Sequence, residues 1–509
     1  MLKLSAGRSG NVAMIFALSI IPFILMLGGA IDFNRQRGMA VEVQAALDSA
    51  LMNVVHEAPG LTDEELKLRM RDSFDAAMQG KSVTVTVFDV VRSGEEIAVT
   101  FDGSIPSTML GIAGIHDMKI GRESAVMAGN KTFEIALALD TTGSMEGDKI
   151  AKLKVAAKTL VTNLSTKIND TNRLKFAVVP FANYVNVGPS NANETWMDKQ
   201  ARASYHAEYF DRDVNRFDLY DHLGIAWPGC VESRPYPHDV DDTEPSIPAP
   251  DTLFVPMFVP DEIDDTLNYP NTYLPDPGTL TGLAAVRDTA KYGVVDPDVP
   301  SGWTPVTVQR ANYGFYSNVT SPQGPDFNCV VRPITPLTSN YASVTTEIDS
   351  LVVGGSTNMV EGIMWGWRAL SERKPFDEGR LYGADNNFKV IVLLTDGNNQ
   401  MNGFPNLLGS DSVSYGYIEN GRLGLSAGAT TEEIGLALDD RFAEACANAR
   451  ARGIIIYTIR LELGDTRSED LLKACATSPA HFLDVPDVDD LDQAFAAIEH
   501  QLLNLHFSK

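Results

Sequence analysis

The chain is 509 residues long, with 67 acidic against 41 basic side chains, a net charge of −26 at pH 7 and 44% hydrophobic residues. This length exceeds what one hydrophobic core usually supports, so two or more domains are expected. So negative a chain argues against nucleic-acid binding, and it suits a protein that works outside the cytoplasm or offers carboxylates to cations.

Residues 12–31 form an uninterrupted apolar run, VAMIFALSIIPFILMLGGAI, with no charged side chain. At ~1.5 Å per residue a helix of this length covers about 30 Å, the thickness of the hydrocarbon core of a bilayer, and Pro22 is tolerated in such a helix. A basic start and small residues near the end of the run also fit a cleaved signal peptide. Because an amphipathic helical pattern continues to Val54, we expect an uncleaved transmembrane anchor and a juxtamembrane helix over residues 1–56.

Three sequence features mark this opening. They are Arg8-Ser9-Gly10-Asn11-Val12-Ala13 at the start of the apolar run, Asp32 after it, and Gln44-Ala45-Ala46-Leu47-Asp48 in the trailing helix. With them the opening resembles the N-terminus of TadE/TadG-like proteins of the Flp (Tad-type) pilus assembly system. Pseudopilins of that system carry Glu five residues after the processing Gly, whereas Ile15 stands five residues after Gly10 here, so prepilin-type processing is not expected. The TadG-like branch, which joins this anchor to an adhesion-type domain, fits better.

Basic residues lie on both sides of the apolar run, so the positive-inside rule does not set its orientation. The large acidic remainder favours export of the C-terminal side. We therefore expect a single-pass protein of the bacterial inner membrane whose bulk is periplasmic or otherwise extracytoplasmic.

Residues 57–130 are expected to form a small α+β spacer. The pattern predicts a charged amphipathic helix at residues 61–78 and strands at residues 83–91, 96–101 and 118–127. No residue pattern in this region indicates chemistry, so we expect it to pack on the juxtamembrane helix.

From residue 131 to residue 505, apolar runs alternate with helical patterns, which is typical of an α/β fold with a doubly wound, mostly parallel sheet. The expected strands are residues 133–139, 175–182, 389–395, 454–461 and 481–485, and the expected helices are residues 150–164, 341–351, 358–371, 431–452, 468–476 and 487–505. Two stretches interrupt the alternation: a proline-rich insertion at about residues 188–336 and an excursion at about residues 398–429. Connections this long within a domain are usually functional elements or subdomains. Each begins where a parallel strand ends, so both are expected at the carboxyl edge of the sheet.

Polar side chains follow the first buried run of this region. Asp140, Thr142 and Ser144 come directly after residues 133–139. In doubly wound folds, ligands bind in the crevice beyond the carboxyl ends of the strands. One carboxylate and two hydroxyls at positions i, i+2 and i+4 offer there the oxygen ligands that a hard cation requires.

Two later stretches supply the same chemistry: Asp396 ends a second buried run, and Thr357 lies in a loop just before a helical pattern. The whole set resembles the metal-ion-dependent adhesion site of the von Willebrand factor type A domain. The pattern of that site is D-x-S-x-S, then a loop Thr, then an Asp after a hydrophobic strand. It is matched here by Asp140, Thr142, Ser144, Thr357 and Asp396, and the one departure, Thr142 in place of Ser, keeps the hydroxyl.

The resemblance implies a divalent metal, with Mg²⁺ first and Mn²⁺ and Ca²⁺ as alternatives, that keeps an open position for a carboxylate of a partner protein. The chain would then be a membrane-anchored, metal-dependent binding module of the pilus machinery rather than an enzyme, and its partners would include other pilus-assembly components. Two alternatives stay open. One is a structural pilus or envelope component whose metal only stabilises the fold. The other is an acyl-phosphate enzyme that uses Asp140 as its nucleophile, although the sequence shows no separate lysine-bearing motif for that chemistry.

The four cysteines lack the Cys-x-x-Cys spacing of a zinc or redox site. We expect Cys446 to pair with Cys475, because the two lie on successive helices that flank the strand at residues 454–461. We also expect Cys230 to pair with Cys329, since this bond would bracket a long and weakly cored insertion. Such disulfides require an oxidising compartment.

Two further expectations concern burial. The histidines of the insertion, His206, His222 and His238, show no ligand spacing and are expected at the surface. Trp365 and Trp367 are two residues apart in a predicted helix, so one is expected in the core and the other exposed.

Overall fold

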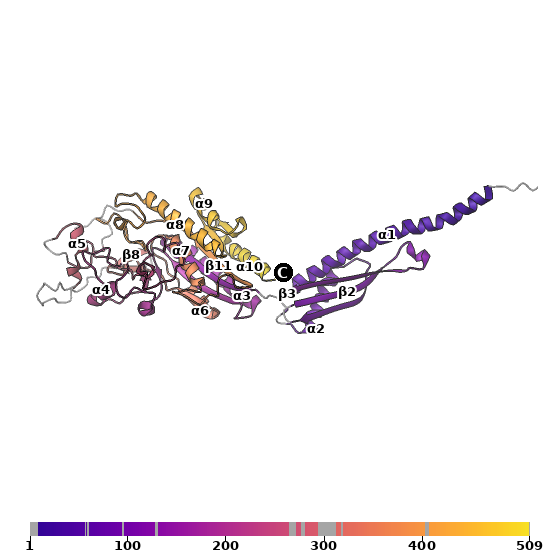
Figure 1. Cartoon of the computed structure of the whole chain (residues 1–509), viewed down its shortest axis with the longest axis horizontal. Helices are drawn as coiled ribbons and strands as arrows, with labels where there is room; N and C mark the ends of the chain where they lie inside the picture. The colour runs from indigo at the N-terminus through magenta and orange to yellow at the C-terminus, as the bar shows by residue number, and fades with distance from the viewer. Residues whose placement is uncertain are drawn as a thin grey trace, which may run out of the picture. The chain divides into compact units, whose positions relative to one another are not determined.

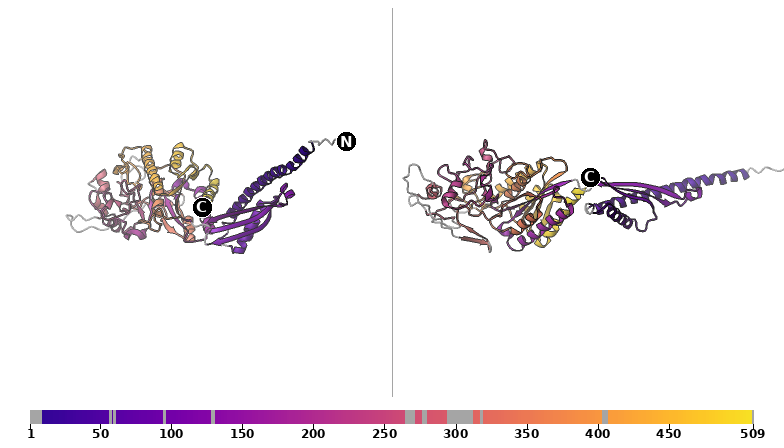
Figure 2. Two further views of the ribbon diagram at one scale, coloured as in Figure 1. Left: turned by 45° about the vertical axis from the view of Figure 1, so that its right-hand side comes forward. Right: turned by 90° about the horizontal axis from the view of Figure 1, so that it is seen from below.

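The computed structural model describes residues 9–55, 58, 61–93, 96–127, 131–263, 271–275, 280–293, 312–316, 319–402 and 407–507. Within these, the side chains of residues 9–15, 17–19, 21, 312–316, 319–321 and 506–507 are not described. The chain divides into two compact units, drawn in Figures 1 and 2. The first unit is Met1–Lys131 with Lys167–Asn169 and Leu503–Lys509, and the second is Thr132–Thr166 with Asp170–Leu502.

The first unit joins one long helix to a small antiparallel sheet. The helices are α1 (Ser9–Val54) and α2 (Asp63–Ala77), and the strands, in the order β1-β2-β3, are β1 (Thr84–Ser93), β2 (Glu96–Pro106) and β3 (Asp117–Met127). Alternate residues of β2, among them Ile97, Val99 and Phe101, are buried, so one face of the sheet carries the core of this unit. The α+β spacer that the sequence predicted therefore has the expected elements.

The apolar start of α1 was predicted to cross a membrane. Among the side chains that the structure describes, no helix is long and apolar enough to do so. Residues 12–15, 17–19 and 21 of the predicted span lie outside those described side chains.

The second unit is built on a six-stranded sheet in the order β10-β5-β4-β11-β12-β13. Its strands are β4 (Thr132–Asp140), β5 (Leu174–Phe181), β10 (Thr335–Thr338), β11 (Asn387–Thr395), β12 (Ile455–Leu461) and β13 (Phe482–Val485). All neighbouring pairs are parallel except β10 with β5. Counted in chain order the sheet reads 3-2-1-4-5-6, the order of a doubly wound fold. The predicted fold class of this unit is thus confirmed.

Helices cover both faces of this sheet (Figure 2). Their bounds are α3 (Asp148–Ile168), α6 (Tyr341–Ser350), α7 (Met359–Leu370), α8 (Thr431–Ala451), α9 (Thr466–Cys475) and α10 (Leu491–Phe507). Asn163 of α3 donates to Glu499 of α10 at 2.8 Å, and Lys158 of α3 pairs with Asp349 of α6, so these three helices are neighbours. Helix α7 packs on β4, β5 and β11, and on α8, which contacts α9. The central strands β4 and β11 are buried on both faces, which explains their continuous apolar sequences.

The insertion leaves the sheet after β5 and returns through β10, whose first residue, Thr335, pairs with Val178 in the middle of β5. Its described helices are α4 (Arg216–Leu223) and α5 (Leu283–Arg287), and its described strands are β6 (Val185–Asn186), β7 (Cys230–Val231), β8 (Asn312–Tyr316) and β9 (Val319–Pro322). The second excursion starts just after β11, so both begin at the carboxyl edge of the sheet, as predicted.

The insertion is not weakly cored, contrary to the sequence-based expectation. The ring of Phe254 lies 4.9 Å from that of Trp365 on α7 and 5.9 Å from that of Trp196. Trp365 packs against the insertion, and the indole N–H of Trp367 donates to the Tyr382 hydroxyl at 2.7 Å, so both tryptophans are buried, at 1% and 2% exposure. The prediction that one of them is exposed was wrong.

All four cysteines are paired, and both predicted disulfides are present. Cys446 of α8 bonds to Cys475 of α9, and Cys230 of β7 bonds to Cys329 near the end of the insertion. The two bonds close chain segments of 29 and 99 residues. Loops of this size limit the conformations of the unfolded chain considerably when they are cross-linked.

Candidate metal centre

Two aspartates lie side by side at the carboxyl edge of the central strands. Asp140 is the last residue of β4, and Asp396 directly follows Thr395, the last residue of β11. Strands β5 and β10 extend the sheet on one side of this pair, and β12 and β13 extend it on the other. The pair therefore stands at the topological switch point, where doubly wound folds bind their ligands.

The structure brings all five residues of the sequence-predicted site together through a chain of polar contacts. Oδ1 of Asp140 accepts hydrogen bonds from the backbone N–H and the hydroxyl of Thr142, at 2.8 and 2.6 Å. The Thr142 hydroxyl lies 3.1 Å from that of Ser144 and 3.3 Å from that of Thr357. The Ser144 hydroxyl donates to Oδ1 of Asp396 at 2.5 Å. Two carboxylates and three hydroxyls thus form one cluster.

The cluster is buried on one side and open on the other. Asp140, Thr142, Thr357 and Asp396 are between 0% and 5% exposed, whereas Ser144 is exposed. Four of the five oxygen-bearing side chains are therefore held in fixed positions, and solvent reaches the cluster through the fifth.

A glycine turn places the Thr357 hydroxyl. Gly355 has φ of +81°, and a Cβ there would come within 2.1 Å of Oδ1 of Asn183, so only glycine fits. That same Oδ1 accepts the backbone N–H of Ser356. The Gly143 N–H donates to the Gly355 carbonyl at 3.1 Å, which ties this turn to the loop after β4.

Two residues that sequence reasoning missed belong to the site. The hydroxyl of Thr395 donates to Oδ2 of Asp140 at 2.7 Å, and Nζ of Lys149 lies 2.8 Å from Oδ2 of Asp396 and 3.4 Å from Glu462. Thr395 gave no signal, because it reads as the end of a strand. Lys149 did give a signal. The helix dipole disfavours a lysine in the first turn of a helix, so a lysine at that position indicates a nearby negative charge that stabilises it.

The electrostatics of the cluster follow from burial and from the two neighbouring carboxylates. Burial, followed by the negative charge of Asp396, raises the pKa of Asp140 to about 7, although the hydrogen bonds from Thr142 and Thr395 oppose the shift. Burial lowers the pKa of Lys149, but the hydrogen bond and charge of Asp396 outweigh it, and the net shift is upward. A second positive charge near Asp396 would therefore stabilise the carboxylate form of Asp140.

The donor set fits a hard divalent cation. In the described part of the chain, no group of three or more His, Cys, Asp or Glu side chains could hold a metal ion. The candidate centre would therefore rely on two carboxylates and neutral hydroxyls, with water completing the shell. This all-oxygen set is the one that Mg²⁺, Mn²⁺ and Ca²⁺ accept, and it disfavours softer metals.

Both excursions frame this edge of the sheet. Ser414, in the second excursion, donates its N–H to the carbonyl of Asn183 at 3.0 Å and accepts the N–H of Ser233 at 2.9 Å. Its hydroxyl accepts a hydrogen bond from Asn358, the residue after Thr357, at 3.1 Å. The two excursions therefore run together beside the loop that carries Thr357.

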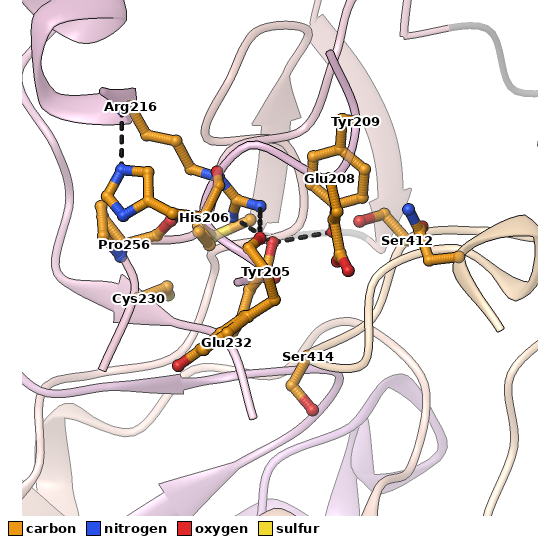
Figure 3. Close-up of polar contacts among 12 residues, drawn as sticks. Tyr205, His206, Glu208, Tyr209, Arg216, Cys230, Glu232, Pro256, Ser412 and Ser414 are labelled. Atoms are coloured by element: carbon orange, nitrogen blue, oxygen red, sulfur yellow. Dashed lines mark hydrogen bonds and ion pairs between the residues drawn. The ribbon is translucent and has the colours of Figure 1, made fainter. Parts of the chain in front are cut away.

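A buried network of charged side chains fastens the excursions to each other, and Figure 3 shows its part around Arg216 and Glu232. Glu232 pairs with Arg216 of α4 through Oε1 and with Arg422 of the second excursion through Oε2, the latter at 2.9 Å. Arg422 also lies 3.4 Å from Glu208 and donates to the carbonyl of Ser233. Buried charges of this kind are tolerated only when each has its partners, so the network fixes one arrangement of the two excursions.

His206 belongs to this network and is fully buried, so the prediction that it lies at the surface was wrong. Its Nε2 accepts the backbone N–H of Arg216 at 3.0 Å (Figure 3). Its Nδ1 lies 2.9 Å from Oδ2 of Asp198. Nδ1 therefore carries the proton and donates to Asp198. Burial lowers the pKa of His206, which keeps the ring neutral in this role.

Comparisons with solved structures return pilus and thread proteins of low sequence identity. The pilus adhesin SpaC from Lactobacillus rhamnosus GG, in its open conformation, is 11% identical, with 83% of this chain and 34% of that chain covered and a TM-score of 0.34. The vWF domain of the type V pili tip protein Mfa5 from Porphyromonas gingivalis is 10% identical, with 74% and 97% covered and a TM-score of 0.33. Proximal thread matrix protein 1 from the mussel byssus, with a zinc-occupied MIDAS motif, is 13% identical, with 73% and 46% covered and a TM-score of 0.28. The chain thus spans about a third of the length of SpaC.

No curated protein matches the chain significantly. Residues 10–51 match the family model described as putative Flp pilus-assembly TadE/G-like. This segment includes the apolar run, Asp32 and the trailing helix that carried the resemblance in the sequence. The chain therefore carries a TadE/G-like pilus-assembly segment at its N-terminus.

Proposed function

We propose that the protein is a membrane-anchored, metal-dependent protein-binding module of the Flp/Tad-type pilus assembly or adhesion machinery. The observation that carries this proposal is the cluster at the switch point of the sheet. Two carboxylates and three hydroxyls converge there, and Ser144 leaves one side open to solvent. A partner protein would present an acidic side chain to that open side.

The charges of the cluster suit this role. Asp140 and Asp396 together offer two negative charges, and the hydroxyls of Thr142, Ser144 and Thr357 are neutral ligands. A bound divalent cation, Mg²⁺ first and Mn²⁺ or Ca²⁺ as alternatives, would be charge-balanced and would bridge the chain to a partner carboxylate. The buried residues hold four of the ligand oxygens in place, so a partner carboxylate would need to order few side chains on this chain.

The TadE/G-like segment and the apolar run support an anchor at residues 12–31 in the bacterial inner membrane, with the bulk of the chain in the periplasm. Large apolar side chains of α1, among them Phe16, Phe23 and Phe33, are 67%, 66% and 49% exposed, which is unfavourable in water. The two disulfides also fit an oxidising compartment outside the cytoplasm.

The test compares the full-length chain with an Asp140→Asn variant, which keeps the shape of the side chain and removes its charge. Calorimetric titration with Mg²⁺ and with Mn²⁺ should show binding to the wild type and none to the variant. Asp489→Asn, at a carboxylate that is 74% exposed and lies outside the cluster, is the matched control and should bind as the wild type does. Equal ion binding by wild type and Asp140→Asn would refute the metal centre.

The proposal that the bound metal captures a partner protein needs a second measurement. Purified pilus-assembly components should bind the wild type in Mg²⁺, lose binding in chelator, and fail to bind Asp140→Asn in either condition. If Asp140→Asn loses the metal but still captures its partners, the metal only stabilises the fold, and the structural alternative holds.

One observation favours a second candidate function. An acyl-phosphate enzyme would need a lysine near its carboxylates, and the structure places Lys149 beside Asp396. Such an enzyme would form an acid-stable, hydroxylamine-labile phosphoprotein on incubation with a phosphoryl donor, and Asp140→Asn would abolish it. We expect no such species, because Asp140 is fully buried and both of its carboxylate oxygens already accept hydrogen bonds.

A further inference from the structure

The turn that joins β2 to β3 carries an exposed apolar tip. This tip, residues 107–116, contains the short 3₁₀ helix η2 (Leu110–Ala113). Met109, Ile112 and Ile115 are 38%, 76% and 48% exposed. Three large apolar side chains in one turn of ten residues are costly in water, so this tip is better suited to an apolar surrounding.

The tip is held firmly against α1. The carboxylate of Asp32 accepts the backbone N–H groups of Thr108, Met109 and Leu110, each at 2.9 Å. Arg35, one turn further along α1, donates to the hydroxyl of Thr108. This clamp uses N–H groups at the start of η2 that have no partner within the helix, so it fixes both the position and the orientation of the tip.

A glycine on α1 sets how close the tip comes. A Cβ at Gly28 would lie 2.6 Å from Cβ of Met109, so a larger residue there would push the tip away. Gly28 is three residues before the end of the apolar run at residue 31, a distance of about 5 Å along a helix. The tip therefore meets α1 at the boundary where its sequence changes from apolar to polar.

The exposed side chains of α1 near the tip change from apolar to charged at the same boundary. On the N-terminal side, Met26 and Leu27 of α1 are 75% and 59% exposed. In Figure 1 the N-terminal part of α1 runs on beyond the sheet. On the C-terminal side, Arg35 is 46% exposed and the Arg37 guanidinium lies 4.8 Å from the centre of the Phe33 ring. Basic residues with long side chains that flank an apolar helix are typical of the headgroup region of a membrane.

We infer that the β2–β3 tip is a second membrane-contact element, which lies in the interfacial layer of the bilayer beside the anchor helix. The inference rests on the proposed anchor at residues 12–31. Lipid is the occupant that the structure favours, because the exposed side chains of the tip continue the exposed apolar surface of α1 at one depth, and the charged residues begin just beyond it. A helix alone can rotate and tilt in a bilayer, whereas a helix with a clamped apolar tip has one preferred orientation. Because the tip joins β2 to β3, the small sheet would then also have one preferred orientation relative to the membrane.

The test places an environment-sensitive fluorophore at single introduced cysteines in the full-length protein. Because all four native cysteines are in disulfides, an introduced cysteine is the only thiol available for labelling. The sites are Ile112→Cys in the tip, Met26→Cys in the anchor and Leu68→Cys on α2, where the side chain is 62% exposed. Each labelled protein is reconstituted into vesicles of phosphatidylcholine and phosphatidylglycerol, with or without spin-labelled lipids that quench fluorescence.

The expected result is a blue-shifted emission at Ile112→Cys that shallow lipid quenchers reduce, a similar response at Met26→Cys to deeper quenchers, and neither change at Leu68→Cys. If Met26→Cys responds and Ile112→Cys behaves like Leu68→Cys, the tip inference is wrong and the anchor stands. If Met26→Cys itself stays in water, the anchor fails and the tip inference fails with it. A blue shift at Ile112→Cys without lipid quenching would mean that protein, such as a second copy of the chain, covers the tip, and this too would overturn the inference.

Discussion

Nζ of Lys149 lies 2.8 Å from Oδ2 of Asp396, within the cluster that we propose binds a divalent cation. The side chain of Lys149 is 23% exposed and that of Asp396 is fully buried. The lysine thus supplies a fixed positive charge to one of the two carboxylates. A cation that binds the cluster would therefore compete with Lys149 for Asp396, and we expect this competition to lower its affinity.

Replacing Lys149 by methionine should strengthen metal binding and weaken the metal-free fold. A positive charge close to the metal is removed, so we expect the affinity for Mn²⁺ and Mg²⁺ to rise roughly tenfold, about 1.4 kcal/mol. Without metal, the buried Asp396 loses the positive charge of Lys149 and keeps the hydrogen bond from Ser144, so the midpoint of thermal unfolding should fall. Calorimetric titration and thermal unfolding with and without Mn²⁺ measure both effects.

The matched control is Lys152→Met. Lys152 lies on the same helix but pairs with the exposed Asp489 at 2.9 Å, outside the cluster. Exposed pairs contribute about 0–1 kcal/mol, so this variant should leave both measurements nearly unchanged. Weaker metal binding in Lys149→Met than in the wild type would show that Lys149 supports the metal instead of competing with it.

Substitutions at Thr142 test the one position at which the chain departs from the D-x-S-x-S pattern of the metal-ion-dependent adhesion site. Thr142→Ser keeps the oxygen that donates to Asp140 at 2.6 Å, so metal affinity should stay nearly the same. Thr142→Ala removes a neutral oxygen ligand of the proposed centre and should weaken Mg²⁺ binding roughly tenfold, about 1.4 kcal/mol. Thr141→Ala is the control, since the Thr141 hydroxyl donates to the Phe181 carbonyl and not to the cluster. Equal losses in Thr142→Ala and Thr141→Ala would indicate a general loss of stability.

Arg422→Met should loosen the second excursion from the first. The arginine is 8% exposed, and its removal leaves Glu208 without this partner and Glu232 with Arg216 as its remaining ion-pair partner, beside the hydrogen bond from the Tyr209 hydroxyl. Breaking a buried ion pair typically costs about 3–5 kcal/mol. We expect a lower free energy of unfolding in chemical denaturation and faster proteolysis within residues 398–429.

A second ion pair between the excursions provides the comparison. Arg287 of α5 lies 3.6 Å from Glu419 of the second excursion, and both side chains are partly exposed. Arg287→Met should change the free energy of unfolding by less than about 1 kcal/mol. Similar proteolysis of both variants would argue that the buried network does not hold the excursions together.

The clamp at Asp32 should depend on pH. Backbone hydrogen bonds, first from Leu110 and then from Thr108 and Met109, lower the pKa of Asp32 below 3.8 although burial opposes the shift. A lowered folded-state pKa means that the carboxylate contributes stability above about pH 4, and that this contribution is lost as the pH falls through the folded-state value. Hydrogen exchange of the Thr108, Met109 and Leu110 amides, corrected for the intrinsic pH dependence, should lose protection over that range.

Asp32→Asn should expose the same three amides to exchange at neutral pH and remove the acid-dependent change. Asp89→Asn is the control, because Asp89 pairs with Lys67 at the surface of the same unit, at 2.8 Å. It should leave the protection of the tip amides unchanged. Unaltered protection in Asp32→Asn would mean that packing at Gly28, not the carboxylate, holds the tip.

Much of the second unit could be predicted because its signals are local. The continuous apolar runs of β4 and β11 indicate strands buried on both faces, and a residue directly after such a strand must lie at the carboxyl edge of a parallel sheet. Asp140 and Asp396 were therefore placed correctly by position in the sequence alone. The disulfide between Cys446 and Cys475 followed from the order of the helices that carry the cysteines.

What the sequence could not show is which distant segment covers a given face. Two different segments cover the two tryptophans of α7: Phe254 of the insertion packs on Trp365, and Tyr382, in the connection from α7 to β11, accepts the indole N–H of Trp367. His206 is buried because Asp198 and Arg216 supply its hydrogen bonds, and their approach depends on the path of the whole insertion.

By itself the sequence determined where the strands of the second unit lie along the chain, which residues stand at their carboxyl ends as candidate ligands, and where the apolar N-terminal run lies, because each depends on residues within one or two turns or strands. The tertiary structure alone decided that Lys149 pairs with Asp396, that Arg422 joins the two excursions, and that Asp32 clamps a turn some 76 residues away. These contacts join residues far apart in the chain, and their energies depend on burial and on distances of a few ångströms. Neither quantity is encoded in local hydrophobic periodicity, so only the folded chain could supply them.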